Sequence, residues 1–117
     1  MAWFHPEEAT QVGVLLGYEH DFPGTRYLIE FADGCSFICK FDASYESENS
    51  GDLNIEMDDP RYDEFHQIAM QVIETVCGGS RGRIDGLTLD YRDFPTQITD
   101  TDTGTVVYSL PTDATPY

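Results

Sequence analysis

Positive charge is scarce in this chain of 117 residues, which holds 22 acidic and 6 basic side chains, with Lys40 as its single lysine. The formal net charge of −16 repels nucleic-acid phosphates and anionic membrane surfaces. Direct binding to DNA, RNA or a membrane is therefore disfavoured, and a basic protein surface is the complementary partner. Acidic, lysine-poor chains are also typical of salt-loving organisms, so a halophile housekeeping domain stays open as an alternative.

Paired cysteines and long apolar runs are also missing. Cys35, Cys39 and Cys77 form an odd set without C-x-x-C spacing, which fits neither a secreted disulfide framework nor a zinc site. No apolar run approaches the roughly 20 residues that cross a bilayer, and MAWFHPEEATQ has neither the basic nor the apolar region of a signal peptide. We therefore expect a cytoplasmic protein without a cofactor, and Cys35 and Cys39 in its core.

Catalytic signatures are likewise missing, since the chain contains no nucleophile elbow, P-loop, dinucleotide-binding glycine motif or zinc-protease helix. The sequence DTDTG from Asp100 matches a calcium loop only in part, because its glycine comes one place early and Pro111 stands at position twelve. Asp63, Glu64 and His66 are possible metal ligands, but a cap and a solvated face explain them more simply. We therefore predict no catalytic residue, no metal and no enzyme activity.

The chain does contain enough apolar material for one folded domain. Hydrophobic residues make up 40% of it and aromatic residues 13%, which is unlike a disordered acidic tail. A length of 117 residues is usual for a single domain with its own core. We predict one acidic domain over residues 1–110, followed by a loose tail, PTDATPY, over residues 111–117.

Alternating apolar residues predict antiparallel strands. Residues 25–41 alternate on both sides of Asp33-Gly34, which indicates a β-hairpin with these two residues at its tip. Residues 87–92 give a further strand, and residues 96–110 give a second hairpin.

A single helix is predicted over residues 60–77. Asp59 fits the N-cap, Pro60 the first helical position, and Gly78 the stop signal. Apolar residues recur between them at spacings of three and four, as expected for one face of a helix. These residues are Tyr62, Phe65, Ile68, Ala69, Val72, Ile73 and Val76.

Residues 11–20, QVGVLLGYEH, are apolar but include Gly13 and Gly17, which indicates a short strand with a bend or bulge. Strands before and after one helix predict an α+β domain. Its mostly antiparallel sheet of about five or six strands would pack against one main amphipathic helix at residues 60–77.

The most unusual segment runs from Phe41 to Phe65, where nine of the 22 carboxylates stand against one basic residue, Arg61. Carboxylates mixed with exposed apolar side chains suit a basic protein partner, because charge steers association and apolar anchors prolong it. The alternative is that LNIEM, residues 53–57, forms an extra strand whose apolar members enter the core. The candidate partner-binding residues are Tyr45, Glu46, Glu48, Asp52, Glu56, Met57, Asp58 and Asp59.

This combination is similar in general type, though in no motif, to bacterial and phage inhibitors such as immunity, anti-restriction and anti-CRISPR proteins. The similarity implies that carboxylates fill the basic cleft of a nuclease or another nucleic-acid-binding protein. An enzyme or small-ligand binder using Arg26, Arg92, His20 and Tyr91 on an open sheet face is the alternative. A homodimer through a sheet edge also stays open.

Overall fold

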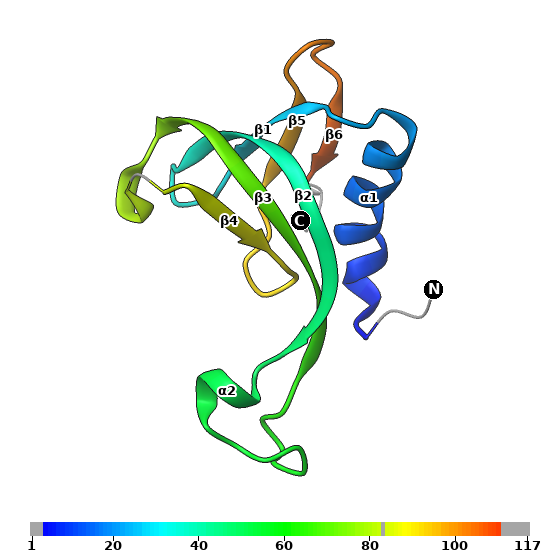
Figure 1. The fold of residues 1–117 in the computed structure, drawn as a ribbon, viewed down its shortest axis with the longest axis vertical. Helices are drawn as coiled ribbons and strands as arrows, with labels where there is room; N and C mark the ends of the chain where they lie inside the picture. Colours follow the sequence, from blue (N-terminus) through cyan, green and yellow to red (C-terminus); the bar gives the residue numbers. More distant parts are fainter. Residues whose placement is uncertain (1–3, 83, 111–117) are drawn as a thin grey trace, which may run out of the picture.

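The computed structural model describes residues 4–82 and 84–110, with the side chains of residues 51, 52 and 80 outside that description. One main helix packs against a six-stranded antiparallel sheet with the strand order β4-β3-β2-β1-β5-β6 (Figure 1). The predicted α+β class, with a mostly antiparallel sheet and one main helix, is confirmed. The predicted tail, 111–117, lies outside the described residues.

Five of the six strands lie where alternation predicts strands. The turn of the first hairpin contains Gly34 at φ 91, a conformation that glycine adopts without strain. The first hairpin pairs Arg26 with Lys40 and Glu30 with Ser36, which confirms the predicted hairpin around Asp33-Gly34. The five strands are β1 (Arg26–Glu30), β2 (Ser36–Glu48), β4 (Gly86–Leu89), β5 (Gln97–Asp100) and β6 (Val106–Ser109).

The predicted helix over residues 60–77 is wrong, because β3 (Glu64–Cys77) is a strand that pairs with β2 along its whole length. Its apolar residues fit both the helical and the strand period. The alternating residues His66, Ile68 and Met70 are buried on one face, and Phe65 is buried on the other. The β-branched residues of this segment also favour a strand. They are Ile68, Val72, Ile73, Thr75 and Val76.

Asp59 and Pro60 begin a turn instead of a helix. The backbone N–H of Tyr62 donates to the carbonyl oxygen of Asp59 at 2.9 Å, which closes a β-turn. Asp at the first position and Pro at the second are favoured in such turns, so the same two residues fit either structure.

The helix lies instead at α1 (Val12–Asp21), which follows the short 3₁₀ helix η1 (Pro6–Ala9). The predicted strand over residues 11–20 is therefore wrong. Val12 and Leu15 are buried and Leu16 is partly buried, which is the three- and four-residue spacing of a helix face. Among the described residues, no helix is long and apolar enough to cross a membrane.

One hydrophobic core lies between α1 and the sheet. Cys35 and Cys39 are buried in it as predicted, whereas Cys77 is exposed. Burial raises the pKa of the Cys39 thiol to about 12, which keeps it neutral and inert. The core also contains Val12, Leu15, Tyr27, Ile29, Phe31, Phe37, Ile68, Met70, Leu87, Leu89 and Ile98.

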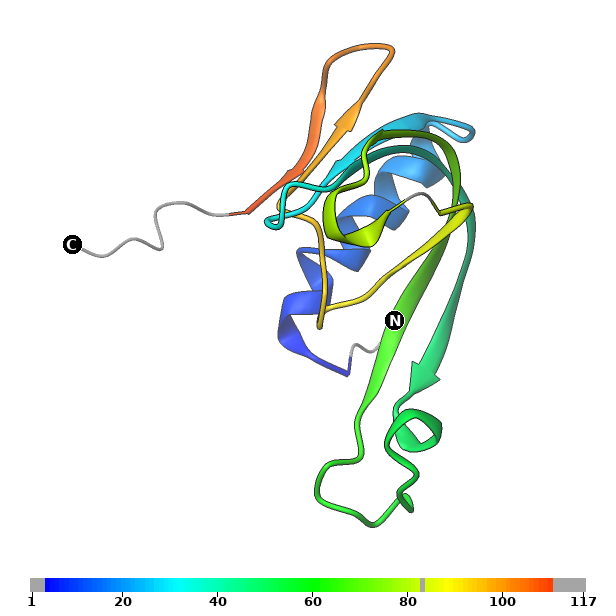
Figure 2. The same ribbon diagram turned by 90° about the vertical axis from the view of Figure 1, so that its left-hand side faces the viewer.

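β2 and β3 extend beyond the rest of the sheet as a two-stranded arm (Figures 1 and 2). β1 pairs with β2 only as far as Lys40, and β4 pairs with β3 only over Ile68–Gln71. The end of the arm is formed by α2 (Ser50–Leu53) and the loop of residues 54–63. We call residues 42–67 the acidic arm, because they contain nine carboxylates.

Candidate functional site

The acidic arm has two faces, since directly opposite residues of antiparallel strands share a face. Glu46 lies opposite His66 and Glu48 lies opposite Glu64, so these four side chains lie on one face. Tyr45 lies on the other face. Glu48 and Glu64 are like charges at directly opposite positions, an arrangement that destabilises a strand pair.

The arm exposes apolar side chains beside its carboxylates. Met57 is 71% exposed, Leu53 44% and Tyr45 43%. The alternative that residues 53–57 form an extra strand entering the core is wrong, because Leu53 ends α2 and residues 54–57 lie in the loop. The end of the arm therefore combines negative charge with apolar anchors.

The predicted partner-binding residues divide between the strand and the loop of the acidic arm. Tyr45 and Glu46 are exposed on β2, and Glu56, Met57 and Asp58 are exposed in the loop. Glu48 ends β2 half-buried, with its carboxylate accepting the backbone N–H of Ser50 at 3.2 Å. The side chain of Asp52 lies outside the described residues.

The carboxylate of Asp59 already forms hydrogen bonds with Arg61. Its carboxylate accepts the backbone N–H of Arg61 at 2.8 Å and the guanidinium Nε and Nη2 at 3.1 and 3.0 Å. These hydrogen bonds, chiefly those from the side chain, hold the pKa of Asp59 below its usual range. Asp59 therefore orders the turn and neutralises the one arginine of the acidic arm.

We call the paired residues 45–48 and 64–67 the arm base. A buried carboxylate that the sequence does not reveal, Glu8, holds it in place. Glu8 has no exposed surface and accepts backbone N–H groups from Phe4 at 2.9 Å and His5 at 3.1 Å. It also accepts the backbone N–H of His66 at 2.6 Å and lies 3.1 Å from the ring Nδ1. Burial raises the pKa of Glu8, but the hydrogen bonds from His66, His5 and Phe4 outweigh it, so the pKa is lowered.

A second cluster lies beside Glu8. The ring Nε2 of His5 is 2.7 Å from Asp63 Oδ1, and the hydroxyl of Tyr91 donates to Asp63 Oδ2. The rings of His5 and Tyr91 stack at 3.9 Å. Burial, followed by the hydrogen bond to Asp63, raises the pKa of Tyr91 to about 12. This cluster ties the residues before η1 and the residues after β4 to the start of β3.

The other face of the arm base is covered by Arg92, whose guanidinium lies 3.8 Å from the centre of the Phe65 ring. Arg92 Nε and Nη2 donate to the two oxygens of Asp90 at 3.0 and 2.9 Å, and Gln67 donates to Asp90 at 2.9 Å. Burial by itself raises the pKa of Asp90, but the hydrogen bonds from Arg92 outweigh this effect, so the pKa of Asp90 is lowered. Both faces of the arm base are therefore fixed by polar contacts.

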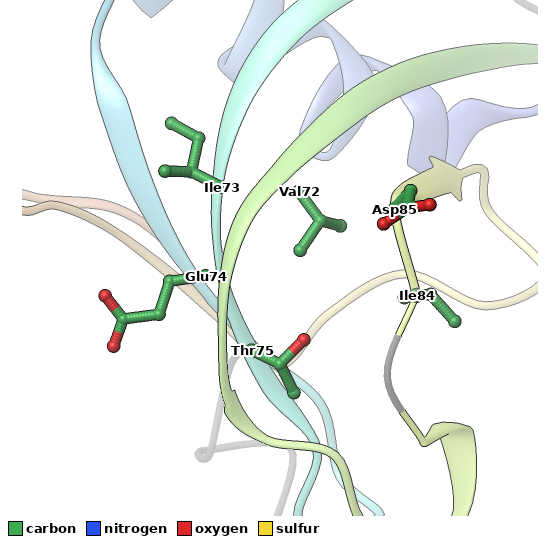
Figure 3. Close-up of a pocket in the computed structure, with 6 residues that line it drawn as sticks. All are labelled: Val72, Ile73, Glu74, Thr75, Ile84 and Asp85. Carbon is green, nitrogen blue, oxygen red and sulfur yellow. The ribbon is translucent and has the colours of Figure 1, made fainter.

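Two of the cavities in the described part of the chain adjoin the sheet. The larger, about 430 Å³, lies between β3 and residues 84–85, and Figure 3 shows Val72 and Thr75 pointing across it. Ile73 and Glu74 point away on the other side of β3. The smaller, about 180 Å³, lies between α1 and the acidic arm and is lined by Val12, Leu16, Ser44, Tyr45, Glu46 and His66.

The residues predicted for a small-ligand site come from separate elements. Tyr91 and Arg92 follow β4 and contact the arm base, as described above. Arg26 begins β1, and His20 lies at the C-terminal end of α1, where its ring is 3.6 Å from Asp21. Within the described part of the chain, no group of three His, Cys, Asp or Glu side chains gathers as a metal site.

The sequence carries little signal for the clusters around Glu8 and Asp63. Glu8 and His66 are 58 positions apart, and so are His5 and Asp63. Comparison with known proteins does not add to this, since no family model, curated protein or solved structure matches the chain.

Proposed function

We propose that this protein is a non-enzymatic binding or inhibitor protein whose acidic arm enters a basic cleft of a protein partner. A nuclease or another nucleic-acid-binding protein is the kind of partner that presents such a cleft. The observation that carries the proposal is the form of the arm, which projects beyond the rest of the sheet (Figure 2). Its end also carries carboxylates and exposed apolar side chains. Immunity, anti-restriction and anti-CRISPR proteins are inhibitors of this general type.

Charge supports the proposal. Nine carboxylates and one arginine give the acidic arm eight negative charges when His66 is neutral. Arg61 is held by Asp59, so it offers little repulsion to a basic partner. A projecting group of like charges raises the rate of encounter with a basic surface, and the effect weakens as salt screens it.

Rigidity at the arm base also supports the proposal. Glu8 holds His66 on one face, and Arg92 covers Phe65 on the other. A surface that is ordered before binding loses less conformational entropy when the complex forms. Exposed Met57 and Leu53 then supply apolar contacts that slow dissociation.

The test begins with affinity capture of the partner from the source cells, followed by association kinetics with two matched variants. E56K/D58K reverses two exposed charges at the end of the arm, and D21K/D102K reverses two exposed charges elsewhere. Each variant removes two negative charges and adds two positive ones, so both variants change the net charge from −16 to −12.

We expect E56K/D58K to lower the association rate about tenfold at low salt, with D21K/D102K having a much smaller effect. The difference between the variants should shrink as salt is added. Equal rates for the two variants across the salt series would contradict the proposal. Folding that requires molar salt would instead favour the halophile alternative.

A further inference from the structure

The smaller cavity beside the acidic arm has the size of one long side chain. Its volume of about 180 Å³ corresponds to about six water molecules at roughly 30 Å³ each. Each water molecule has one non-hydrogen atom, and a lysine or arginine side chain has about as many non-hydrogen atoms as the cavity has room for water molecules. Ligand sites for larger molecules usually begin at about 300 Å³.

The lining of this cavity combines apolar side chains with an exposed carboxylate. α1 contributes Val12 and Leu16, while β2 contributes Glu46, whose side chain is 70% exposed. Glu46 Oε2 lies 3.8 Å from His66 Nε2. Long basic side chains bury an aliphatic stem and keep a charged end near water or a carboxylate, which is the distribution this lining complements.

The charged groups around His66 are also compatible with a bound cation. Buried Glu8 contacts the Nδ1 side of the His66 ring, and Glu46 lies near its Nε2 side. With His66 neutral, these three groups carry two negative charges, and with His66 protonated they still carry one. None of the six lining residues is lysine or arginine.

We propose that this cavity is an anchor pocket for one lysine or arginine side chain of the basic partner. The inference rests on the proposed function and adds a further contact that slows dissociation of the complex. Glu46 lines the pocket and is itself an exposed residue of the acidic arm. β1 pairs with β2 only as far as Lys40, so β1 does not cover the part of β2 that lines the pocket. A basic side chain of a partner that is attracted by the arm could therefore approach the pocket along this part of β2.

The pocket can be tested without the partner, by titrating the protein with small probes and following the methyl signals of Val12 and Leu16 by NMR. The probes are n-butylguanidinium, n-butylammonium and the neutral 1-pentanol. We expect saturable binding of both cations in the millimolar range and binding of 1-pentanol about fivefold weaker. Equal binding of the neutral probe, or no response at Val12 and Leu16, would overturn the proposal.

Two variants identify the residues responsible. E46Q removes the charge and keeps the shape, so it should reduce the affinity for both cations to that of 1-pentanol. S44L, at an exposed position on β2, should fill the pocket and abolish binding of all three probes. D21K/D102K, at exposed positions outside the arm, is the control for net charge and should leave probe binding unchanged. Unaltered cation binding by E46Q would overturn the proposal even if S44L failed to fold.

Kinetics with the captured partner then separate the pocket from the arm. S44L should raise the dissociation rate about tenfold with little change in association, because it blocks an anchor and alters no charge. E56K/D58K should act mainly on association. An unchanged dissociation rate in S44L beside slowed association in E56K/D58K would overturn the pocket while the proposed function stands.

Discussion

The carboxylate of Glu8 engages both the backbone N–H and the ring Nδ1 of His66, although the two residues are 58 positions apart. Glu8 has no exposed surface, and His66 is 7% exposed. A buried carboxylate is costly unless N–H groups satisfy it, and Glu8 meets this condition with donors from two segments. The contact therefore joins the segment before α1 to the base of the acidic arm.

The first prediction concerns this contact. E8Q should lower the free energy of unfolding by about 2 kcal/mol or more, because a neutral amide accepts these hydrogen bonds less well and brings unpaired N–H groups into a buried site. Urea unfolding followed by circular dichroism measures the change. E7Q, at the neighbouring exposed position in η1, is the control and should have little effect. Equal midpoints for E8Q and E7Q would show that the Glu8 contacts contribute little.

Local patterns in the sequence were sufficient to predict the hairpins but not the positions of helix and long strand. Asp33-Gly34 specifies a turn by itself, so the first hairpin follows from its neighbours in the chain. In residues 64–77 the helical and strand periods both fit, and pairing with β2 decides between them. In residues 12–21 two glycines suggest a bend, yet burial of Val12 and Leu15 against the sheet stabilises a helix.

The candidate site was predictable only in part, for a related reason. The carboxylates of the acidic arm are contiguous in the sequence, so their concentration is visible without a structure. The contacts at the arm base join His5 to Asp63, Glu8 to His66, and Gln67 to Asp90. The members of each pair are distant in the chain. They meet because β3 lies between the segment before α1 and the residues after β4.

The second prediction uses the like charges at opposite positions in the arm. E64K replaces the Glu48–Glu64 pair with opposite charges, and we expect it to raise the melting temperature by about 2 °C at low salt. The gain should shrink as salt screens the pair. E74K is the matched control, because Glu74 is an exposed residue of the same strand but lies opposite Ile38. A gain of the same size in E74K would attribute the effect to net charge alone.

The third prediction concerns the cover on the other face of the arm. R92K keeps the charge but loses the two-point hydrogen bonding to Asp90 and the stacking on Phe65. We expect faster hydrogen exchange at the amides of residues 45–48 and 64–67, because the arm base opens more easily. R26K, on the exposed Arg26 of β1, should leave these amides unchanged. Unchanged exchange in R92K would show that Arg92 does not hold the arm.

The fourth prediction concerns acid and the contact between α1 and β5. The hydroxyl of Tyr18 donates to Asp100 Oδ2 at 2.5 Å, and this hydrogen bond lowers the pKa of Asp100 below its ordinary value of 3.8. A carboxyl with a lowered folded-state pKa stabilises the fold above its unfolded pKa, and the contribution is lost as pH falls through the folded value. Y18F removes the donor, so it should melt at a lower temperature than the wild type at pH 7.

The difference in melting temperature between Y18F and the wild type should narrow as pH falls below about 3.8. Protonated Asp100 is no longer stabilised as an anion by the hydroxyl of Tyr18. Other carboxyls with lowered pKa values, such as Glu8 and Asp90, are present in both proteins, so their effects cancel in the difference. Y108F, which removes a hydroxyl from half-buried Tyr108 on β6, should show a gap that does not vary with pH. A gap for Y18F that stays constant from pH 7 to pH 3 would mean that Asp100 does not depend on Tyr18 for its charge, and the contact would then hold α1 by packing alone.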